Sequence, residues 1–246
     1  MKRMALLRAL LFTDPLVILA TIAYGTAAFL VSFFDANGRR QIAVARAWSR
    51  ALLRIGFIQV EVEGLEKIAP DGSYVFASSH LSYMDTPVVL ANIPVQFRFL
   101  AKKGLFQVPF LGTHLARAGH IPVPREDPRA AVRTLTTSAD AIRARGVSML
   151  IFPEGGRSQT GDLQPFKEGG AYIAIKASVP LVPIALDGTR AVLPFGSAII
   201  RPGRVRMRVG DPIPTSGLTL RDRVRLTGQV RDEIVAMLDN KTPAHV

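Results

Sequence analysis

The sequence contains a run of twenty residues without a charged side chain, from Pro15 to Phe34, which reads PLVILATIAYGTAAFLVSFF. A helix rises about 1.5 Å per residue, so this run reaches the roughly 30 Å thickness of a hydrocarbon core. A signal peptide would have a shorter apolar segment followed by a small-residue cleavage site, which residues 32–34 do not supply. We therefore expect a retained membrane anchor.

A second helix is predicted directly after the anchor, over residues 41–57. Apolar residues recur there at spacings of three and four, and Arg46, Arg50 and Arg54 form a stripe beside them. The pattern is typical of an interfacial helix whose guanidinium groups lie among lipid phosphates, and equally of a surface helix packed on a protein core. We expect residues 1–56 to form an anchor with an interfacial helix, and residues 57–246 to form the main domain.

The charge of the chain indicates an anionic partner. Its 31 Lys and Arg residues outnumber its 19 Asp and Glu residues, which gives a net charge of +12. Aromatic residues make up only 7%, and no recognition-helix or zinc-finger spacing occurs, so we expect no nucleic acid partner. Membrane phospholipids and phosphorylated substrates remain. More Lys and Arg residues follow the anchor than precede it, which favours a membrane protein with its main domain on the cytoplasmic face.

Beyond the anchor, strand-like and helix-like segments alternate, which predicts an α/β domain. The predicted strands cover residues 57–63, 74–79, 97–101, 120–123, 148–152, 181–186 and 204–209. The predicted helices cover residues 87–92, 108–117, 128–145, 170–177 and 220–238. In the last strand, Arg204, Arg206 and Arg208 would share one face, where we expect them to attract anionic headgroups.

The first candidate site lies at residues 78–85, SSHLSYMD, where an apolar strand ends at His80 and Asp85 follows five residues later. A carboxylate on Nδ1 would fix the tautomer of the imidazole, and Nε2 could then take a proton from a substrate hydroxyl. The same spacing also occurs where an aspartate only caps a helix beside a structural histidine.

The second candidate site lies at residues 151–158, IFPEGGRS, where another apolar strand enters a glycine-bearing turn. Backbone N–H groups at Gly155 and Gly156, with the Arg157 guanidinium, could form an anion cradle. The alternative is a polar loop in which Glu154 and Arg157 only pair with each other.

Other chemistries find no support in the sequence. The chain has no cysteine, which excludes disulfides, thiolate metal sites and a cysteine nucleophile. His114 and His120 lack the spacing of a metal site, so we expect no metal.

The two blocks together resemble the glycerolipid acyltransferase family, which includes the lysophosphatidic acid acyltransferases. That family has a His-x4-Asp block and, later in the chain, a Phe-Pro-Glu-Gly-Thr-Arg-Ser block. Two weaker blocks also agree: AKKGLFQVPFLG at 101–112, leading to IPVPR at 121–125, and VPLVPIA at 179–185. The resemblance spans about residues 60–210.

The resemblance implies an α/β fold in which a single sheet is flanked by helices, with residues 57–246 as the acyltransferase domain. It implies His80 as the general base and Asp85 as its orienting partner. The remaining implied residues bind substrate: Glu154, Gly155, Gly156, Arg157 and Ser158 around the acceptor phosphate, with added positive charge from Lys102, Lys103 and Arg125. Gly156 departs from the family, which usually has Thr there, and this suggests a looser phosphate loop.

The implied activity is transfer of a fatty acyl group from acyl-CoA or acyl-ACP to the sn-2 hydroxyl of lysophosphatidic acid, which gives phosphatidic acid in phospholipid biosynthesis. No cofactor is implied besides this co-substrate. Two alternatives stay open: an acyltransferase for another lysolipid or for glycerol 3-phosphate, and a non-catalytic membrane protein that binds anionic lipid.

Overall fold

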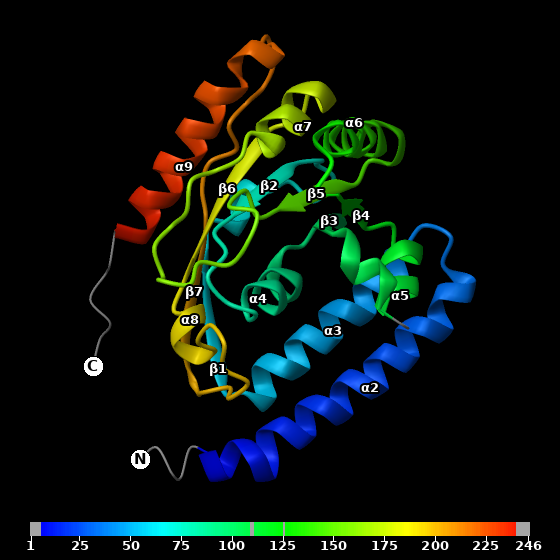
Figure 1. Cartoon of the computed structure of the whole chain (residues 1–246), viewed down its shortest axis with the longest axis vertical. Helices are drawn as coiled ribbons and strands as arrows, with labels where there is room; N and C mark the ends of the chain where they lie inside the picture. The colour runs from blue at the N-terminus through cyan, green and yellow to red at the C-terminus, as the bar shows by residue number, and fades with distance from the viewer. Residues whose placement is uncertain (1–5, 109–110, 125, 240–246) are drawn as a thin grey trace.

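A single seven-stranded sheet forms the centre of the molecule (Figure 1). The computed structural model describes residues 6–108, 111–124 and 126–239. Its strand order is β1-β7-β6-β2-β5-β3-β4, and the strands from β6 to β4 run parallel, whereas β7 is antiparallel to β6 and parallel to β1. The bounds are β1 Ile58–Glu63, β2 Val75–Ser78, β3 Phe97–Lys102, β4 Ile121–Val123, β5 Ser148–Ile151, β6 Leu181–Asp187 and β7 Gly203–Val209.

Helices cover both faces of the sheet (Figure 1). Strand β2 is buried on both sides, because Phe76 belongs to one apolar cluster and its neighbour Val75 to the other. The first cluster lies under helices α3 and α4, and the second lies under α6, α7 and α9. The helix bounds are α2 Asp14–Val31, α3 Arg39–Ile55, α4 Asp85–Asn92, α5 Leu111–Arg117, α6 Pro128–Arg145, α7 Gly169–Ala177, α8 Thr189–Val192 and α9 Arg223–Asp239. The predicted α/β fold and its predicted strands and helices are confirmed.

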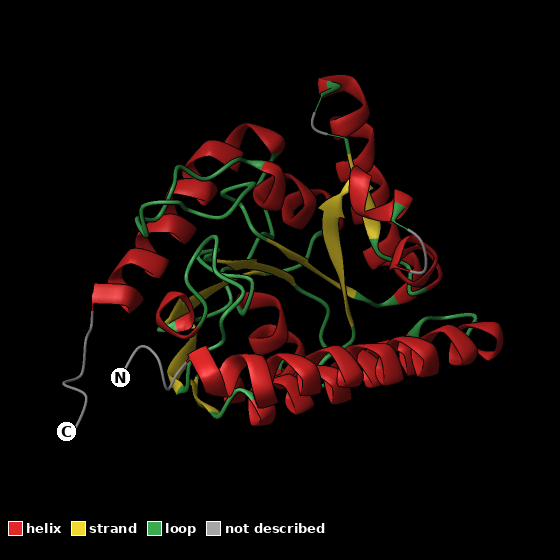
Figure 2. Ribbon diagram, turned by 60° about the horizontal axis from the view of Figure 1, so that its bottom comes forward, coloured by secondary structure: helices red, strands yellow, loops and turns green. Residues whose placement is uncertain are grey.

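The predicted anchor is a continuous apolar helix from Leu6 to Phe34, with a mean hydropathy of 2.1 in its most apolar window. A π-helical turn at Ala9–Thr13 precedes α2, and a 3-10 turn at Ser32–Phe34 follows it. The helix lies alongside α3, and the two form a hairpin across the base of the domain (Figure 2). Only 6% of the most apolar 18-residue stretch of this helix is buried, so most of its apolar surface faces away from the protein.

The turn of this hairpin is fixed to the main domain. The Asp35 carboxylate accepts hydrogen bonds from the backbone N–H groups of Arg39 and Gln41, at 3.1 and 2.8 Å. The buried Arg98 of β3 donates to the carbonyl oxygen of Asn37 at 2.6 Å. Residues 1–56 are therefore packed against the domain that follows them in the sequence.

The structure decides between the two interpretations of the arginine stripe. Helix α3 lies between α2 and α4, and the Arg46 guanidinium donates to the carbonyl oxygens of Ile93, Pro94 and Val95 just beyond the end of α4. Arg46 is thus a structural residue, whereas Arg50 and Arg54 are exposed. The expectation that all three contact lipid phosphates is wrong for Arg46.

The arginines of β7 also differ from the expectation. Arg206 pairs with Glu61 and Glu63 of the neighbouring strand β1, and Arg208 pairs with Glu63 and donates to the Met237 carbonyl. Because β1 and β7 run in parallel register, the glutamates of one strand lie beside the arginines of the other. Of the three, only Arg204 is exposed, so this face is not a basic surface of the predicted kind.

Replacing Arg46 by Met should lower the free energy of unfolding by about 1–3 kcal/mol, because the three carbonyl oxygens lose a charged donor. Arg50→Met is the matched control, since Arg50 is exposed one turn later on the same helix, and it should change stability by less than about 0.5 kcal/mol. Denaturant titration of the detergent-solubilised proteins checks both values. Equal losses in the two variants would contradict the structural role of Arg46.

Candidate active site

His80 and Asp85 meet where β2 turns into α4. The chain leaves the sheet after Ser78, and α4 begins at Asp85. The Ser82 hydroxyl holds the turn between them, because it accepts from the Met84 N–H at 3.0 Å and donates to the Leu193 carbonyl at 2.8 Å. His80 Nδ1 lies 2.9 Å from Asp85 Oδ2, as the spacing predicts.

The surroundings of Asp85 define the tautomer of the imidazole. Asp85 is fully buried, and its Oδ2 also accepts from the backbone N–H groups of Leu81 and Ser82, at 2.7 and 2.8 Å. Oδ2 acts as the acceptor in these contacts, because both backbone groups can only donate. Nδ1 therefore carries the hydrogen in the neutral ring, and Nε2 is the basic nitrogen.

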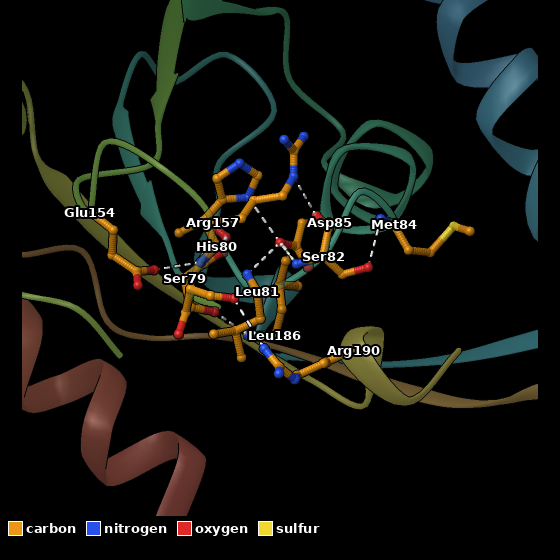
Figure 3. Close-up of polar contacts among 12 residues, drawn as sticks. Ser79, His80, Leu81, Ser82, Met84, Asp85, Glu154, Arg157, Leu186 and Arg190 are labelled. Carbon is orange, nitrogen blue, oxygen red and sulfur yellow. Dashed lines mark hydrogen bonds and ion pairs between the residues drawn. The ribbon is translucent and has the colours of Figure 1, made fainter. Parts of the chain in front are cut away.

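Glu154 links the second motif to the first (Figure 3). Its Oε1 accepts from the backbone N–H of His80 at 2.6 Å, and its Oε2 accepts from the backbone N–H of Gln164 at 2.9 Å. Burial raises the pKa of Glu154, and the hydrogen bonds from Gln164 and His80 oppose that effect. A buried carboxylate whose two oxygens hold backbone donors is placed to position His80, and the role of Glu154 at the acceptor phosphate stays a prediction.

Two further contacts from the same loop hold His80. The Ser158 N–H donates to the His80 carbonyl oxygen at 3.2 Å, and the Phe152 ring stacks on the imidazole with centroids 3.8 Å apart and planes 15° apart. The peptide groups on both sides of His80 and one face of its ring are thus fixed by residues 152–158. Positioning the imidazole is one function of this loop.

Arg157 projects to the same side of the loop as the His80 ring (Figure 3). Its Nε donates to the Ser82 carbonyl at 3.2 Å, and its guanidinium carbon lies 3.8 Å from the centroid of the Tyr83 ring. Burial lowers the pKa of Arg157, while Tyr83 and Asp85 act in the opposite direction. Among the described residues no carboxylate pairs with Arg157, so the alternative of a Glu154–Arg157 ion pair is wrong.

The predicted anion cradle is only partly present. The N–H of Gly155 donates to the Phe152 carbonyl within the turn, and the Ser158 hydroxyl is buried and accepts from the Gly161 N–H. Gly155 has a φ of 75°, which favours glycine, and a Cβ there would lie 2.9 Å from Lys167 Nζ. Gly155 and Ser158 therefore shape the loop. Gly156 differs, because a Cβ there would meet no atom within 4 Å.

The other predicted cations lie farther along the same edge of the sheet. Lys102 ends β3 and Lys103 begins the 3-10 turn after it, and both are exposed. Strand β5 separates β3 from β2, so the structure places these lysines two strands away from His80. Arg125 lies outside the described residues.

Sequence reasoning did not single out three residues that complete the site. Arg190 of α8 donates to the carbonyl oxygens of Ser158 and Gln159, at 3.0 and 2.6 Å, and so holds the far end of the loop. Phe152 was included in a predicted strand and in the second motif without a role of its own, and Lys167 was not considered. No local pattern marks Lys167, and none marks Arg190, which acts on a loop 32 residues earlier in the sequence.

The described residues contain no group of three His, Asp or Glu side chains that could hold a metal ion. His120 is buried, its Nδ1 accepts from the Phe99 N–H at 2.9 Å, and burial lowers its pKa to about 3. It is therefore a neutral, structural histidine in the core.

Comparison with known proteins agrees with this geometry. A family model described as Acyltransferase matches residues 59–187, more than half of the chain. A chloroplastic 1-acyl-sn-glycerol-3-phosphate acyltransferase of Brassica napus is 36% identical over 69% of this chain and 49% of its own length. Its counterpart in Arabidopsis thaliana is 33% identical over 80% of this chain and 53% of its own length. The chain spans about half the length of these curated relatives.

A solved structure is similar over nearly the whole chain. The crystal structure of the 1-acyl-sn-glycerophosphate (LPA) acyltransferase PlsC from Thermotoga maritima matches with a TM-score of 0.79 and 25% identity, and it covers 98% of this chain and 100% of that one. The matched family segment contains His80, Asp85 and the whole 152–158 loop. The sequence match, the shared fold and the assembled dyad lead to one conclusion: the chain belongs to the acyltransferase family.

Proposed function

We propose that this protein transfers a fatty acyl group from an acyl thioester to the sn-2 hydroxyl of lysophosphatidic acid, and so makes phosphatidic acid. The observation that carries the proposal is the pair of His80 and Asp85 beside Arg157 at one edge of the sheet, with Nδ1 and Oδ2 2.9 Å apart. The relatives named as 1-acyl-sn-glycerol-3-phosphate acyltransferases support the choice of acceptor.

The reaction begins with removal of a proton from the acceptor hydroxyl. His80 Nε2 takes this proton as the hydroxyl oxygen attacks the thioester carbonyl carbon, and the carbonyl electrons move to its oxygen. Asp85 stabilises the imidazolium that forms, because its Oδ2 holds Nδ1–H. The intermediate then collapses, the carbon–sulfur bond breaks, and the imidazolium returns its proton to the leaving thiolate.

We assign the acceptor phosphate to Arg157. Its Nε donates to the Ser82 carbonyl, and one face of its guanidinium group lies on the Tyr83 ring. The described residues offer no acceptor to its two terminal nitrogens. A guanidinium fixed in this way presents a planar pair of donors to a phosphate at little entropic cost. Lys167, whose Nζ lies beside Gly155, adds positive charge to the same loop, while Lys102 and Lys103 add charge farther along the edge.

The donor is acyl-CoA or acyl-ACP in this proposal, and no further cofactor takes part. Each is a thioester whose carrier is soluble in water, whereas the acceptor and the product stay in a bilayer. An enzyme held at the membrane surface has access to both. The basic residues that follow the apolar helix support placing the domain on the cytoplasmic face.

The shape of the hairpin favours an anchor that lies in one leaflet. The apolar helix packs along α3 across the base of the domain instead of projecting from it (Figure 2). A helix perpendicular to the membrane would carry α3 and α4 into the hydrocarbon core, although α3 exposes charged groups at Arg50 and Arg54. A helix parallel to the surface buries its exposed apolar face and leaves the domain in water.

The deciding experiment is an acyl-transfer assay with purified full-length protein, acyl-CoA and acyl-ACP, and a panel of lyso-acceptors, with products identified by mass spectrometry. Phosphatidic acid as the main product supports the proposal. A preference for another lysolipid or for glycerol 3-phosphate would show that lysophosphatidic acid is not the acceptor. An absence of transfer from either donor would favour the non-catalytic lipid-binding alternative.

His80→Ala should reduce turnover by about 10²–10⁴-fold, because it removes the only base in the proposed site. The fold should remain, since the β2 core residues are unchanged. His114→Ala is the matched control, because His114 lies on α5 outside the site. A His80→Ala protein with more than about a tenth of the parent activity would exclude the general-base role.

Glu154→Gln should lower kcat by about tenfold or more while the KM for the acceptor stays within about twofold. The amide group of Gln places a donor against one of the two backbone N–H groups that the carboxylate now holds, so His80 is displaced. Asp162→Asn, an exposed carboxylate in the same loop, is the control and should leave both constants unchanged. A change in acceptor KM alone would instead return Glu154 to the phosphate site.

Arg157→Lys should raise the KM for the phosphorylated acceptor by about tenfold and leave the KM for the acyl donor unchanged. Lysine keeps the charge but loses the planar pair of donors and the stacking on Tyr83. Steady-state kinetics with each substrate varied in turn checks this result. An effect confined to the donor would show that Arg157 does not bind the phosphate.

A further inference from the structure

We infer that Phe57, with the exposed arginines Arg54, Arg201 and Arg204, forms a second membrane contact, which takes a bilayer surface with anionic headgroups. We call these four residues the Phe57 patch. The inference rests on the proposed attachment of the apolar helix to a membrane and adds a site where α3 joins the main domain. It is based on the backbone conformation of Phe57, its exposure, and its neighbours.

Phe57 has a conformation that an aromatic residue rarely adopts. Its φ is 53°, in the left-handed region, directly after the end of α3. Helices often end with such a residue, and it is usually glycine because a Cβ is strained there. The chain does have a glycine next to it, but Gly56 is needed for packing, since a Cβ there would lie 2.9 Å from the Ile200 side chain.

The protein interior does not account for this aromatic side chain. Phe57 is 66% exposed, although Ile58 beside it is buried. A strained and largely exposed phenylalanine lowers the stability of the domain compared with glycine, so its side chain gains its contacts outside the protein. Aromatic rings are favoured at the boundary between headgroups and hydrocarbon.

The patch is continuous with the apolar helix. The Phe57 carbonyl accepts from the Gly203 N–H, and the nearby Ile200 carbonyl accepts from the Arg8 guanidinium of the apolar helix at 3.3 Å. The end of α3 and the start of β1 therefore lie near the beginning of that helix (Figure 1). Leu7, Leu10 and Leu11 are 58–60% exposed in the same part of the helix.

The charges of the patch match an anionic surface. Arg54, Arg201 and Arg204 are exposed, and none of them pairs with a carboxylate among the residues that the structure describes. Parallel pairing of β1 and β7 brings Arg204 beside Gln59, two residues from Phe57. An aromatic ring among unpaired arginines suits the interface of an anionic leaflet.

The first test measures contact with lipid. Trp48 is replaced by Phe to remove the single native tryptophan, and Phe57→Trp is added as a reporter in the full-length protein. The control is Val224→Trp in the same background, because Val224 is 61% exposed on α9, at the far side of the sheet. On vesicles with 30 mol% phosphatidylglycerol, lipids brominated near the headgroup should quench the fluorescence of residue 57 and not that of residue 224.

The second test separates binding from stability. Phe57→Gly should not lower the thermal midpoint in detergent, because glycine accepts the left-handed conformation. It should nevertheless raise the rate of protein transfer from donor to acceptor vesicles by about tenfold, since the membrane loses one buried aromatic side chain. Replacing Arg54 and Arg201 by Gln should raise this rate on anionic vesicles only.

The outcomes distinguish the two proposals. A parent protein that does not sediment with vesicles would overturn the membrane attachment and this inference together. A parent that sediments, with no quenching at residue 57 and an unchanged transfer rate for Phe57→Gly, would overturn the inference alone. If Phe57 packs against a second copy of the chain, lipid would not quench residue 57, and Phe57→Gly would dissociate a dimer in size-exclusion chromatography, which also overturns it.

Discussion

The hydrogen bond from the His80 N–H to the Glu154 carboxylate, 2.6 Å long, is the interaction on which the arrangement of the site depends. It joins the ends of two neighbouring parallel strands, β2 and β5, whose register sets the distance between the two motifs. The return contact from the Ser158 N–H to the His80 carbonyl holds the peptide group on the other side of the same residue. Two segments more than seventy residues apart thus hold the imidazole as one unit, and Phe152 and Asp85 fix its plane. Charged and polar side chains are used here for positioning before any substrate is bound.

The net positive charge of the chain does not reveal which arginines bind groups within the fold and which remain for a partner. Arg46 and Arg98 bind carbonyl oxygens where helix and strand ends meet, and Arg190 binds those of the loop after β5. Arg206 and Arg208 pair with glutamates on the next strand. A guanidinium satisfies several oxygens at once, which suits the carbonyl groups of loops at the ends of strands and helices. The arginines bound in this way are not available to an outside partner, and Arg157 is the one that lies beside His80 and Asp85.

The sequence predicted the strands and helices well, because the buried strands are short apolar runs between polar turns and the helices have a clear period. It also predicted the His80–Asp85 contact, since the four residues of turn between them leave little freedom. It could not predict the role of Glu154, because both of its partners are backbone N–H groups whose positions depend on strand register. The same holds for Arg46. The arginine spacing on α3 is typical of a lipid-facing helix, and only the packing of α4 against α3 shows that Arg46 binds within the protein. Residues that bind backbone atoms across the fold leave no periodic signal.

Gly156 illustrates how the structure changes the meaning of a departure from the family pattern. From sequence, glycine in place of the usual threonine suggests a looser loop. The loop is held at its other positions, however, by Glu154 and Ser158 on His80 and by Arg190 on Ser158 and Gln159. A Cβ at Gly156 would enter open space, so no protein contact is lost by its absence. A threonine side chain there would instead project from the loop that carries Arg157. The glycine therefore changes the shape of the space beside Arg157 that is offered to the acceptor. The stability of the loop depends on the contacts of Glu154, Ser158 and Arg190, which do not involve Gly156.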